Sequence, residues 1–145
     1  MTVSVLTKEN IVLGAEIGNK EEAIRLAGKV LVEQGYVDDV YIDKMFEREA
    51  LTSTYMGNFI AIPHGTEEAK ALVKKAGLSF IQVPNGVDFG AGNIVKILIG
   101  IAGKDNEHLE ILSKIALVCS EAENVEKMIQ ATTKEEILEL LNEVN

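Results

Sequence analysis

Apolar residues recur at intervals of three and four positions in the first third of the chain, which is the spacing of an amphipathic helix. Asn19-Lys-Glu-Glu22 matches a capping box, in which the Asn19 side chain bonds the backbone N–H three residues on, and Gly35 follows the last apolar position. A second helical pattern starts near Asp38 or Asp39 and runs to about Leu51. Its apolar face consists of Val40, Tyr41, Met45 and Leu51. The pattern predicts two helices before residue 52.

The middle of the chain carries short runs of apolar and β-branched residues, which are typical of strands. Phe59-Ile-Ala-Ile62 is one such run, and it ends at Pro63 because proline donates no hydrogen bond to a neighbouring strand. Residues 78–83 form a second run, and Asn85-Gly86 after it predicts a tight hairpin with residues 87–89 as the return strand. Residues 94–102 are nearly all apolar, which indicates a central strand covered by helices on both faces.

The last third of the chain returns to helical spacing. Asp105 is placed as the N-cap of a helix whose apolar positions continue to Cys119. A short helix begins near Glu121, and a last one opens with the capping box Thr133-Lys-Glu-Glu136. Helices thus enclose a run of strands without strict alternation, repeats or a linker. We predict an α/β fold: a single-domain sandwich over residues 1–145, with a mixed central sheet flanked by helices.

Composition and charge narrow the classes of function. The chain has 145 residues, 47% of them apolar, which suffices for one core and not for two sizeable domains. Its 14 Lys and Arg against 23 Asp and Glu give a net charge of −9, which opposes binding to nucleic acid. The sequence shows no secretory signal and no apolar run long enough to cross a bilayer. We therefore expect a cytoplasmic protein without membrane insertion.

His64 is the first candidate for chemistry. Pro63 fixes the backbone at a strand end, Gly65 leaves the imidazole unobstructed, and residues 66–70 are suited to begin a short helix whose N–H groups point back toward the ring. In α/β folds, strand ends that face helix N-termini bind anions and other ligands. From spacing alone, a surface histidine in a loop explains His64 equally well.

His108 is the second candidate, in the first turn of the helix that Asp105 begins. The helix dipole disfavours a charged imidazole there, whereas the backbone N–H groups attract anions. The placement suits a histidine that meets an anion. A first-turn histidine bonded to a backbone carbonyl is the other interpretation.

Arg48 is the third candidate, because it interrupts an apolar stripe. At 100° per residue, Tyr41, Met45, Arg48 and Thr52 fall within an arc of about 60°. A guanidinium in this position must be paired or lie at the mouth of a site, since burying an unpaired charge costs several kcal/mol. Arg48 is therefore either a partner in a structural salt bridge or a clamp for phosphate oxygens.

The three candidates together suggest an imidazole nucleophile that holds a phosphoryl group, a second imidazole that donates to it and a cation that offsets its charge. Other chemistries have less support in the sequence. There is no His-x-x-x-His motif or cysteine cluster for a metal, no Gly-x-Ser-x-Gly elbow, and no glycine-rich nucleotide loop. We expect neither a metal nor a cofactor.

The segment from Ser53 to Thr66, with Arg48-Glu49 before it and Asn106-Glu107-His108-Leu109 after it, resembles a known family. It is similar to the enzyme IIA component of the mannitol/fructose class of the bacterial sugar phosphotransferase system, over essentially the whole chain. Gly-Val-Asp-Phe at 86–89 and the segment 100–108 favour the mannitol branch. The end of the chain soon after its last helix suggests a free-standing IIA.

The resemblance implies that His64 is phosphorylated by the carrier protein HPr and passes the group to a cysteine of the IIB component. That component phosphorylates the sugar during uptake, and the membrane component IIC is an indirect partner. The resemblance also implies that His108 and Arg48 line the pocket of His64. We expect His64 in a shallow depression with an apolar rim that includes Phe59, Met45 or Leu109.

Two alternatives remain open at this point. Within the family, the chain fits a fructose-type or regulatory IIA protein that signals through its phosphorylation state. Outside it, the chain fits a non-catalytic anion-binding domain with the same fold.

Overall fold

Helix α1 (Lys20–Glu33) begins at the capping box that the sequence predicts. In the computed structural model, which describes residues 5–142 but not the side chains of residues 105–107, the Asn19 side chain accepts the Glu22 N–H at 2.9 Å. Gly35 has a φ of +79° just beyond the helix. Helix α2 (Val40–Leu51) follows and agrees with its predicted range. Both predicted helices are therefore present.

The sheet has five strands in the order β1-β4-β5-β3-β2. They are β1 (Ile11–Val12), β2 (Tyr55–Gly57), β3 (Ile60–Ala61), β4 (Gly77–Asp88) and β5 (Ile94–Ala102). The pairs β1–β4 and β3–β5 are parallel, whereas β4–β5 and β2–β3 are antiparallel. This pattern confirms the mixed sheet, and β5 spans the residues predicted for the central strand.

The hairpin predicted at Asn85-Gly86 is wrong. Strand β4 runs through these residues, and its register with β5 shifts between Gln82 and Val87, so Asn85-Gly86 lies in an irregularity of one long strand. Gly86 has a positive φ of +78°, which glycine adopts easily both in a tight turn and at an irregularity of a strand. The reversal comes after Asp88 instead, where the N–H of Phe89 donates to the carbonyl of Asn93 at 2.9 Å.

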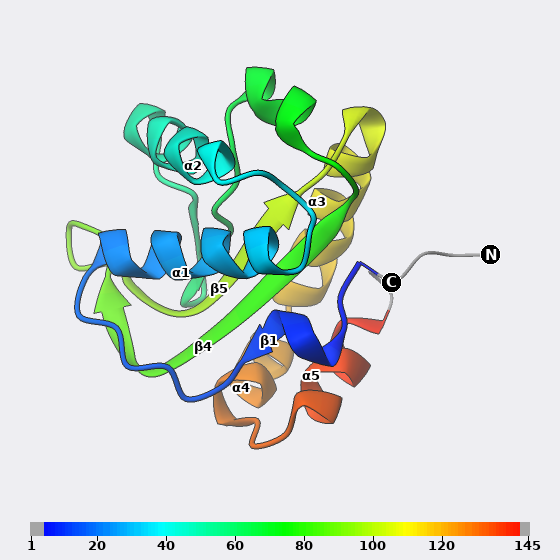
Figure 1. Ribbon diagram of the computed structural model, residues 1–145. Coiled ribbons are helices and arrows are strands. Elements are labelled where there is room, and N and C mark those ends of the chain that lie inside the picture. Colours follow the sequence, from blue (N-terminus) through cyan, green and yellow to red (C-terminus); the bar gives the residue numbers. More distant parts are fainter. Residues whose placement is uncertain (1–4, 143–145) are drawn as a thin grey trace.

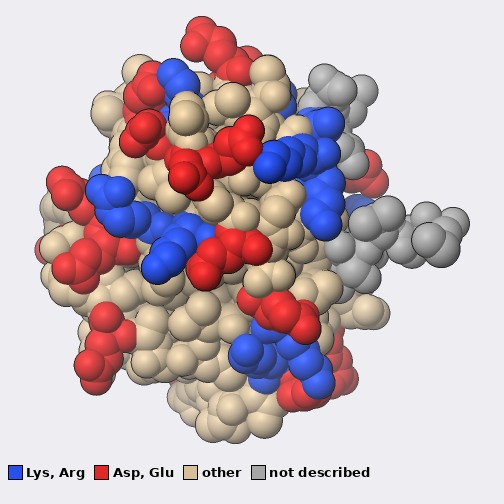
Figure 2. All heavy atoms as spheres, in the orientation of Figure 1, with Lys and Arg blue, Asp and Glu red and all other residues tan. Residues whose placement is uncertain are grey.

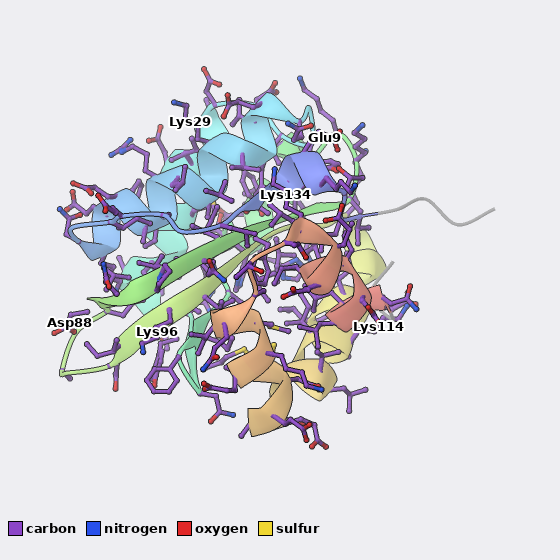
Figure 3. The ribbon with its side chains drawn as sticks, turned by 90° about the horizontal axis from the view of Figure 1, so that it is seen from below. Glu9, Lys29, Asp88, Lys96, Lys114 and Lys134 are labelled. Carbon is purple, nitrogen blue, oxygen red and sulfur yellow. The ribbon has the colours of Figure 1, made fainter. Side chains whose placement is uncertain are left out.

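Helices cover both faces of the sheet, as predicted (Figure 1). Helices α1 and α2 and the 3-10 helix η2 (Glu67–Leu72) pack on one face. Helices α3 (Asp105–Cys119), α4 (Ala122–Gln130) and α5 (Lys134–Leu140) pack on the other. Figure 3 shows β4 and β5 running between these two layers. On β5, Ile97, Ile99 and Ile101 face the second layer, whereas Leu98 and Ala102 face the first.

Polar side chains on β4 fasten each helical layer to the sheet. The Gln82 amide donates to the carbonyls of Met128, Ile129 and Ala131 at 2.9–3.2 Å, which satisfies the end of α4. On the opposite face, the Ser79 hydroxyl donates to the carbonyl of Ala27 in α1 at 2.9 Å. These buried bonds fix the layers that carry the site residues.

Two predicted helix details need correction. Helix α2 buries Tyr41 and Met45, but Val40 and Leu51 are 51% and 75% exposed, so its apolar face is narrower than predicted. The backbone of α3 starts at Asp105, and Lys104 occupies the cap position. The Asp105 side chain, predicted as the cap, lies outside the described side chains. The capping box at Thr133 is present, since its side chain accepts the Glu136 N–H.

Surface charges of both signs alternate on the face shown in Figure 2. Several form ion pairs, such as Lys74–Asp38 at 2.9 Å and Lys44–Glu47 at 2.9 Å. Among residues 5–142, no helix is long and apolar enough to cross a membrane. The remaining 3-10 helix, η1 (Lys8–Asn10), precedes β1.

Candidate functional site

His64 and His108 meet at one edge of the sheet. His64 follows β3 and forms an isolated parallel bridge with Ile101 near the end of β5. His108 lies near the start of α3, which follows β5 after a short connection. Because β3 and β5 are parallel neighbours, their carboxyl ends lie at the same edge. The two ring centroids are 5.0 Å apart, with the ring planes inclined at 57°.

A pocket of about 230 Å³ contains all three predicted residues. Its lining comes from α2, from the connection after β3, from η2 and from the start of α3. The lining residues are Tyr41, Arg48, Leu51, His64, Gly65, Thr66, Glu67, Lys70, Gly103 and His108. The fold therefore brings together residues that are far apart in the sequence.

The His64 ring is oriented by its own backbone. Its Nδ1 atom lies 2.7 Å from the carbonyl oxygen of Ile62. A carbonyl oxygen only accepts hydrogen bonds, so Nδ1 carries the proton and Nε2 carries the lone pair in the neutral ring. Burial lowers the pKa of His64 and outweighs the bond to Ile62, which raises it. The half-buried ring is thus a neutral imidazole whose Nε2 carries the free lone pair.

His108 is buried and also neutral at neutral pH. Burial is the main cause that lowers its pKa to about 4, and the charges of His64 and Lys70 add to the effect. A neutral imidazole has one N–H donor and one acceptor nitrogen. His108 is therefore equipped to donate one hydrogen bond into the pocket.

Arg48 lies in the last turn of α2 and is half-buried. Its Nη1 donates to the Thr52 carbonyl at 2.7 Å, beyond the helix end. Within the part of the chain that the structure describes, Arg48 takes part in none of the ion pairs, so the salt-bridge interpretation has no partner there. The guanidinium lines the pocket, and its charge lowers the pKa of His64.

Tyr41 has a role that the sequence does not reveal. Its hydroxyl donates to the Ile101 carbonyl at 2.8 Å and accepts the Gly65 N–H at 2.9 Å. A Cβ atom on Gly65 would lie 2.7 Å from the Tyr41 ring. The Tyr41 ring thus requires a glycine at position 65. This is a second reason for Gly65, besides leaving the imidazole of His64 unobstructed. Tyrosine on an apolar stripe signals burial, but the spacing does not identify the hydroxyl's partners.

Glu49 and Thr54 are not lining residues of the pocket, and the sequence patterns also miss them. Both are buried, and the Thr54 hydroxyl donates to Glu49 Oε1 at 2.5 Å. Lys20 of α1 lies 3.0 Å from Glu49 Oε2. The only early sign was the position of Glu49 beside Arg48 in the family motif.

The charge of the pocket differs from that of the chain. The charged lining residues whose side chains the structure describes are Arg48, Lys70 and Glu67, which sum to +1, whereas the whole chain carries −9. Lys70 and Glu67 pair at 2.8 Å, which leaves Arg48 as the cation without a carboxylate partner among the described lining residues. Such a pocket suits an anionic group.

The predicted apolar rim is only partly correct. Met45 is 1% exposed and cannot form a rim. Phe59 is exposed, and its carbonyl accepts the N–H groups of Lys96 and Ile97 on β5. His64 pairs with Ile101, four residues farther along the same strand. Four residues span about 13 Å of a strand, so Phe59 lies too far from His64 to form a rim. Leu109, beside His108, and Leu51, in the lining, are the exposed apolar residues near the pocket.

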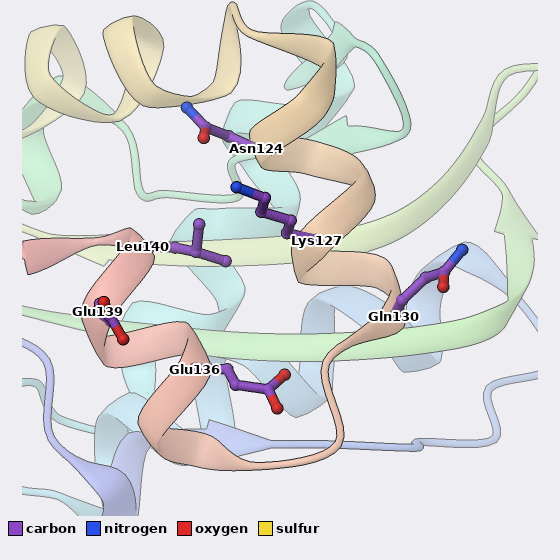
Figure 4. Close-up of a pocket in the computed structure, with 6 residues that line it drawn as sticks. All are labelled: Asn124, Lys127, Gln130, Glu136, Glu139 and Leu140. Atoms are coloured by element: carbon purple, nitrogen blue, oxygen red, sulfur yellow. The ribbon is translucent and has the colours of Figure 1, made fainter.

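A larger hollow of about 640 Å³ lies between α4 and α5. Figure 4 shows its polar lining, in which Lys127 and Gln130 come from α4 and Glu136 and Glu139 from α5. It contains none of the predicted site residues. Among the described residues, no group of three or more His, Cys, Asp or Glu is placed to hold a metal ion. Burial raises the pKa of the Cys119 thiol to about 11, so this thiol stays protonated.

Comparison with known proteins identifies the family of the chain. Residues 4–144 match the family model described as "Phosphoenolpyruvate-dependent sugar phosphotransferase system, EIIA 2". The chain is 75% identical, over the full length of both chains, to the mannitol-specific phosphotransferase enzyme IIA component of Geobacillus stearothermophilus.

Two solved structures share the fold. The crystal structure of IIA mannitol from Escherichia coli is 45% identical, with a TM-score of 0.88 over 94% of this chain and 98% of that one. The complex of enzyme IIAMTL with phosphorylated enzyme IIBMTL from the same organism gives 44% identity and a TM-score of 0.90, over 95% and 97% of the two chains. The α/β architecture with a mixed five-stranded sheet is thus common to these proteins.

Proposed function

The chain belongs to the EIIA 2 family of the phosphoenolpyruvate-dependent sugar phosphotransferase system, and from this membership we propose that it is a mannitol-specific phosphoryl carrier with His64 as its acceptor. The observation that carries the assignment of His64 is its hydrogen bond to Ile62. This bond leaves Nε2 unprotonated, in a pocket with a second histidine and an arginine. The carrier takes a phosphoryl group from phospho-HPr and gives it to a cysteine of the IIB component.

The acceptance step needs a neutral imidazole. Nε2 of His64 attacks the phosphorus, the new N–P bond forms, and the N–P bond to the imidazole of HPr breaks with its electron pair staying on HPr. The proton on Nδ1 stays in place, held by the Ile62 carbonyl, so the phosphorylated ring carries a positive charge beside the anionic phosphoryl oxygens. The lowered pKa of His64 keeps the free ring neutral and able to attack.

His108 and Arg48 stabilise the transferred group. In the loose transition state of phosphoryl transfer, charge spreads over three equatorial oxygens, and the protein mainly positions the reactants and offsets that charge. The N–H of neutral His108 donates to one of these oxygens, and the Arg48 guanidinium offsets the remaining charge. The net positive charge of the described lining residues supports both roles.

The partners follow from membership of the family. HPr is the donor, the IIB component is the acceptor, and IIC is reached only through IIB. A relative's structure, the complex of IIAMTL with phosphorylated IIBMTL, supports the acceptor. Transfer between proteins calls for transient contacts of modest area. Residues 1–145 act as one cytoplasmic domain in this scheme, with Leu51 and Leu109 as apolar contacts beside the pocket.

The test is phosphoryl transfer from phospho-HPr to the wild type and to His64→Ala, followed by intact mass and by acid treatment of the product. The wild type gains one acid-labile phosphoryl group, and the variant gains none. A labelled His64→Ala variant overturns the assignment of the acceptor. Subsequent addition of mannitol-type and fructose-type IIB proteins identifies the branch, since only the cognate IIB discharges the carrier rapidly.

A further inference from the structure

A buried carboxylate outside the pocket is connected to His64 by successive hydrogen bonds. Glu49 of α2 is 8% exposed, and Thr54 donates to it through its N–H at 3.0 and 3.1 Å and through its hydroxyl at 2.5 Å. The Thr54 carbonyl accepts the Ile62 N–H at 3.1 Å. The Ile62 carbonyl accepts Nδ1–H of His64 at 2.7 Å. Three links thus run from Glu49 to the imidazole.

The charge of Glu49 is costly in this place and calls for an explanation. Burial raises the pKa of Glu49, but hydrogen bonds from Ser53, Thr54 and Lys20 outweigh burial, so the pKa is lowered and the carboxylate is ionised at neutral pH. Lys20, from α1, supplies the compensating cation at 3.0 Å. Both carboxylate oxygens are used, since Thr54 donates to Oε1 and Oε2 and Lys20 lies beside Oε2. A neutral amide, which has a single acceptor oxygen, would avoid the cost of burying a charge but would lose one of these contacts. The ionised carboxylate therefore holds Thr54 and Lys20 at the same time.

The bonds fix the one carbonyl that orients the His64 ring. The Ile62 residue is held on one side by its N–H bond to Thr54. On the other side the Pro63 carbonyl accepts the Ile101 N–H at 2.9 Å, and the proline ring fixes φ. Thr54 itself lies in the connection between α2 and β2, where its hydroxyl and its N–H both donate hydrogen bonds to the Glu49 carboxylate. Through Thr54, Glu49 is thus one of the groups that hold the Ile62 carbonyl in place.

We propose that Glu49 is a positioning residue for phosphoryl transfer: through Thr54 and Ile62 its carboxylate holds the His64 ring with the proton on Nδ1 and the lone pair on Nε2. The proposal rests on the function proposed above and explains how that function obtains the required tautomer. Glu49 also acts on the ring through space, since its charge raises the pKa of His64 and opposes Arg48. Among the described residues, Glu67 and Lys70 also act on the charge of the second ring, His108.

The test compares Glu49→Gln and Thr54→Val with Glu47→Gln, a matched control on the same helix whose carboxylate is exposed and pairs with Lys44. Nitrogen-15 chemical shifts of the His64 ring report its tautomer in the unphosphorylated protein. We expect the wild type to carry the proton on Nδ1 and the two test variants to show a mixture. We expect transfer from phospho-HPr to fall about tenfold to a hundredfold in both, as for a misplaced reacting group. Thr54→Ser, which keeps the hydroxyl, restores both readouts.

The control Glu47→Gln is expected to stay within about twofold of the wild type, as exposed substitutions do. Folded Glu49→Gln and Thr54→Val proteins with the wild-type tautomer and rate would overturn the proposal and leave Glu49 a structural residue. If Glu49→Gln does not fold, Thr54→Val decides the question by the same two readouts. If the wild type itself accepts no phosphoryl group, the proposed function is wrong. The tautomer measurement still tests whether Glu49 positions the His64 ring.

Discussion

The imidazole rings of His64 and His108 lie with their centroids 5.0 Å apart, one after β3 and the other near the start of α3. A proton on one ring disfavours a proton on the other, and burial disfavours both. The pair is therefore kept neutral at neutral pH, which leaves one ring able to attack a phosphorus atom and the other able to donate to its oxygens.

The buried histidines make the stability of the fold depend on pH. His108 has a pKa of about 4 in the folded protein against an ordinary value of 6.5, so the unfolded chain binds more protons between these two pH values. The free energy of unfolding should fall by up to about 3 kcal/mol as the pH drops from 6.5 to 4. His64, whose pKa is also lowered, adds to the fall in the same direction.

Urea unfolding at a series of pH values across this window measures the effect. His108→Gln should flatten the dependence, because it removes the larger of the two titrations. Glu49 has a lowered pKa in the folded protein, so its contribution to the free energy of unfolding is lost only below pH 4.5, the ordinary pKa of a glutamate. The effect of Glu49 therefore lies at lower pH than that of the histidines. If the free energy of unfolding of His108→Gln depends on pH as steeply as that of the wild type, His108 is not the cause of the dependence.

Substitution of His108 should slow phosphoryl transfer without unfolding the protein. His108→Ala removes one preorganised donor to the phosphoryl oxygens, for which a loss of about a hundredfold in rate is expected. Time-resolved transfer assays with phospho-HPr measure the loss, with Leu117→Ala, an exposed leucine farther along the same helix, as the control. Equal rates in His108→Ala and the wild type would exclude His108 from the site.

Arg48→Lys should keep the positive charge but lose the planar fork that matches phosphate oxygens. Loss of one charge-assisted hydrogen bond lowers the transfer rate about tenfold. Arg25→Lys is the matched control, because Arg25 lies over the Phe46 ring on the helical layer and lines no part of the pocket. A slowed Arg25→Lys and an unaffected Arg48→Lys would contradict the clamp.

Tyr41→Phe should destabilise the connection that carries His64. The substitution leaves the Gly65 N–H and the Ile101 carbonyl without their buried partner, and the free energy of unfolding should fall by about 1–3 kcal/mol. Thermal or urea unfolding measures the loss, and Tyr55→Phe, on the half-buried strand β2, serves as the control. Equal stability of the two variants would show that the Tyr41 hydroxyl holds nothing in place.

The sequence predicts most elements because their signals are local. The capping boxes at Asn19 and Thr133 fix helix starts within one turn, and the apolar run at 94–102 identifies the central strand. The hairpin prediction fails because a positive φ at Gly86 suits both a turn and an irregular strand. Only pairing with β5, which is not local, decides between them.

In the candidate site, too, the sequence reveals local features and misses those that depend on distant residues. His64, His108 and Arg48 are unusual for their local positions, and the fold brings all three to one pocket. Tyr41, Glu49 and Thr54 look ordinary in the sequence, because their importance comes from partners on other elements. The tautomer of His64 depends on a backbone carbonyl, which no side-chain pattern reports.

The most direct test of the account is the position of the phosphoryl group on the carrier. Wild-type protein labelled with nitrogen-15 in its histidines, once phosphorylated by phospho-HPr, should show phosphorus–nitrogen coupling at Nε2 of His64 and an intact N–H at its Nδ1. Coupling at Nδ1 of His64, or at either nitrogen of His108, would contradict the account.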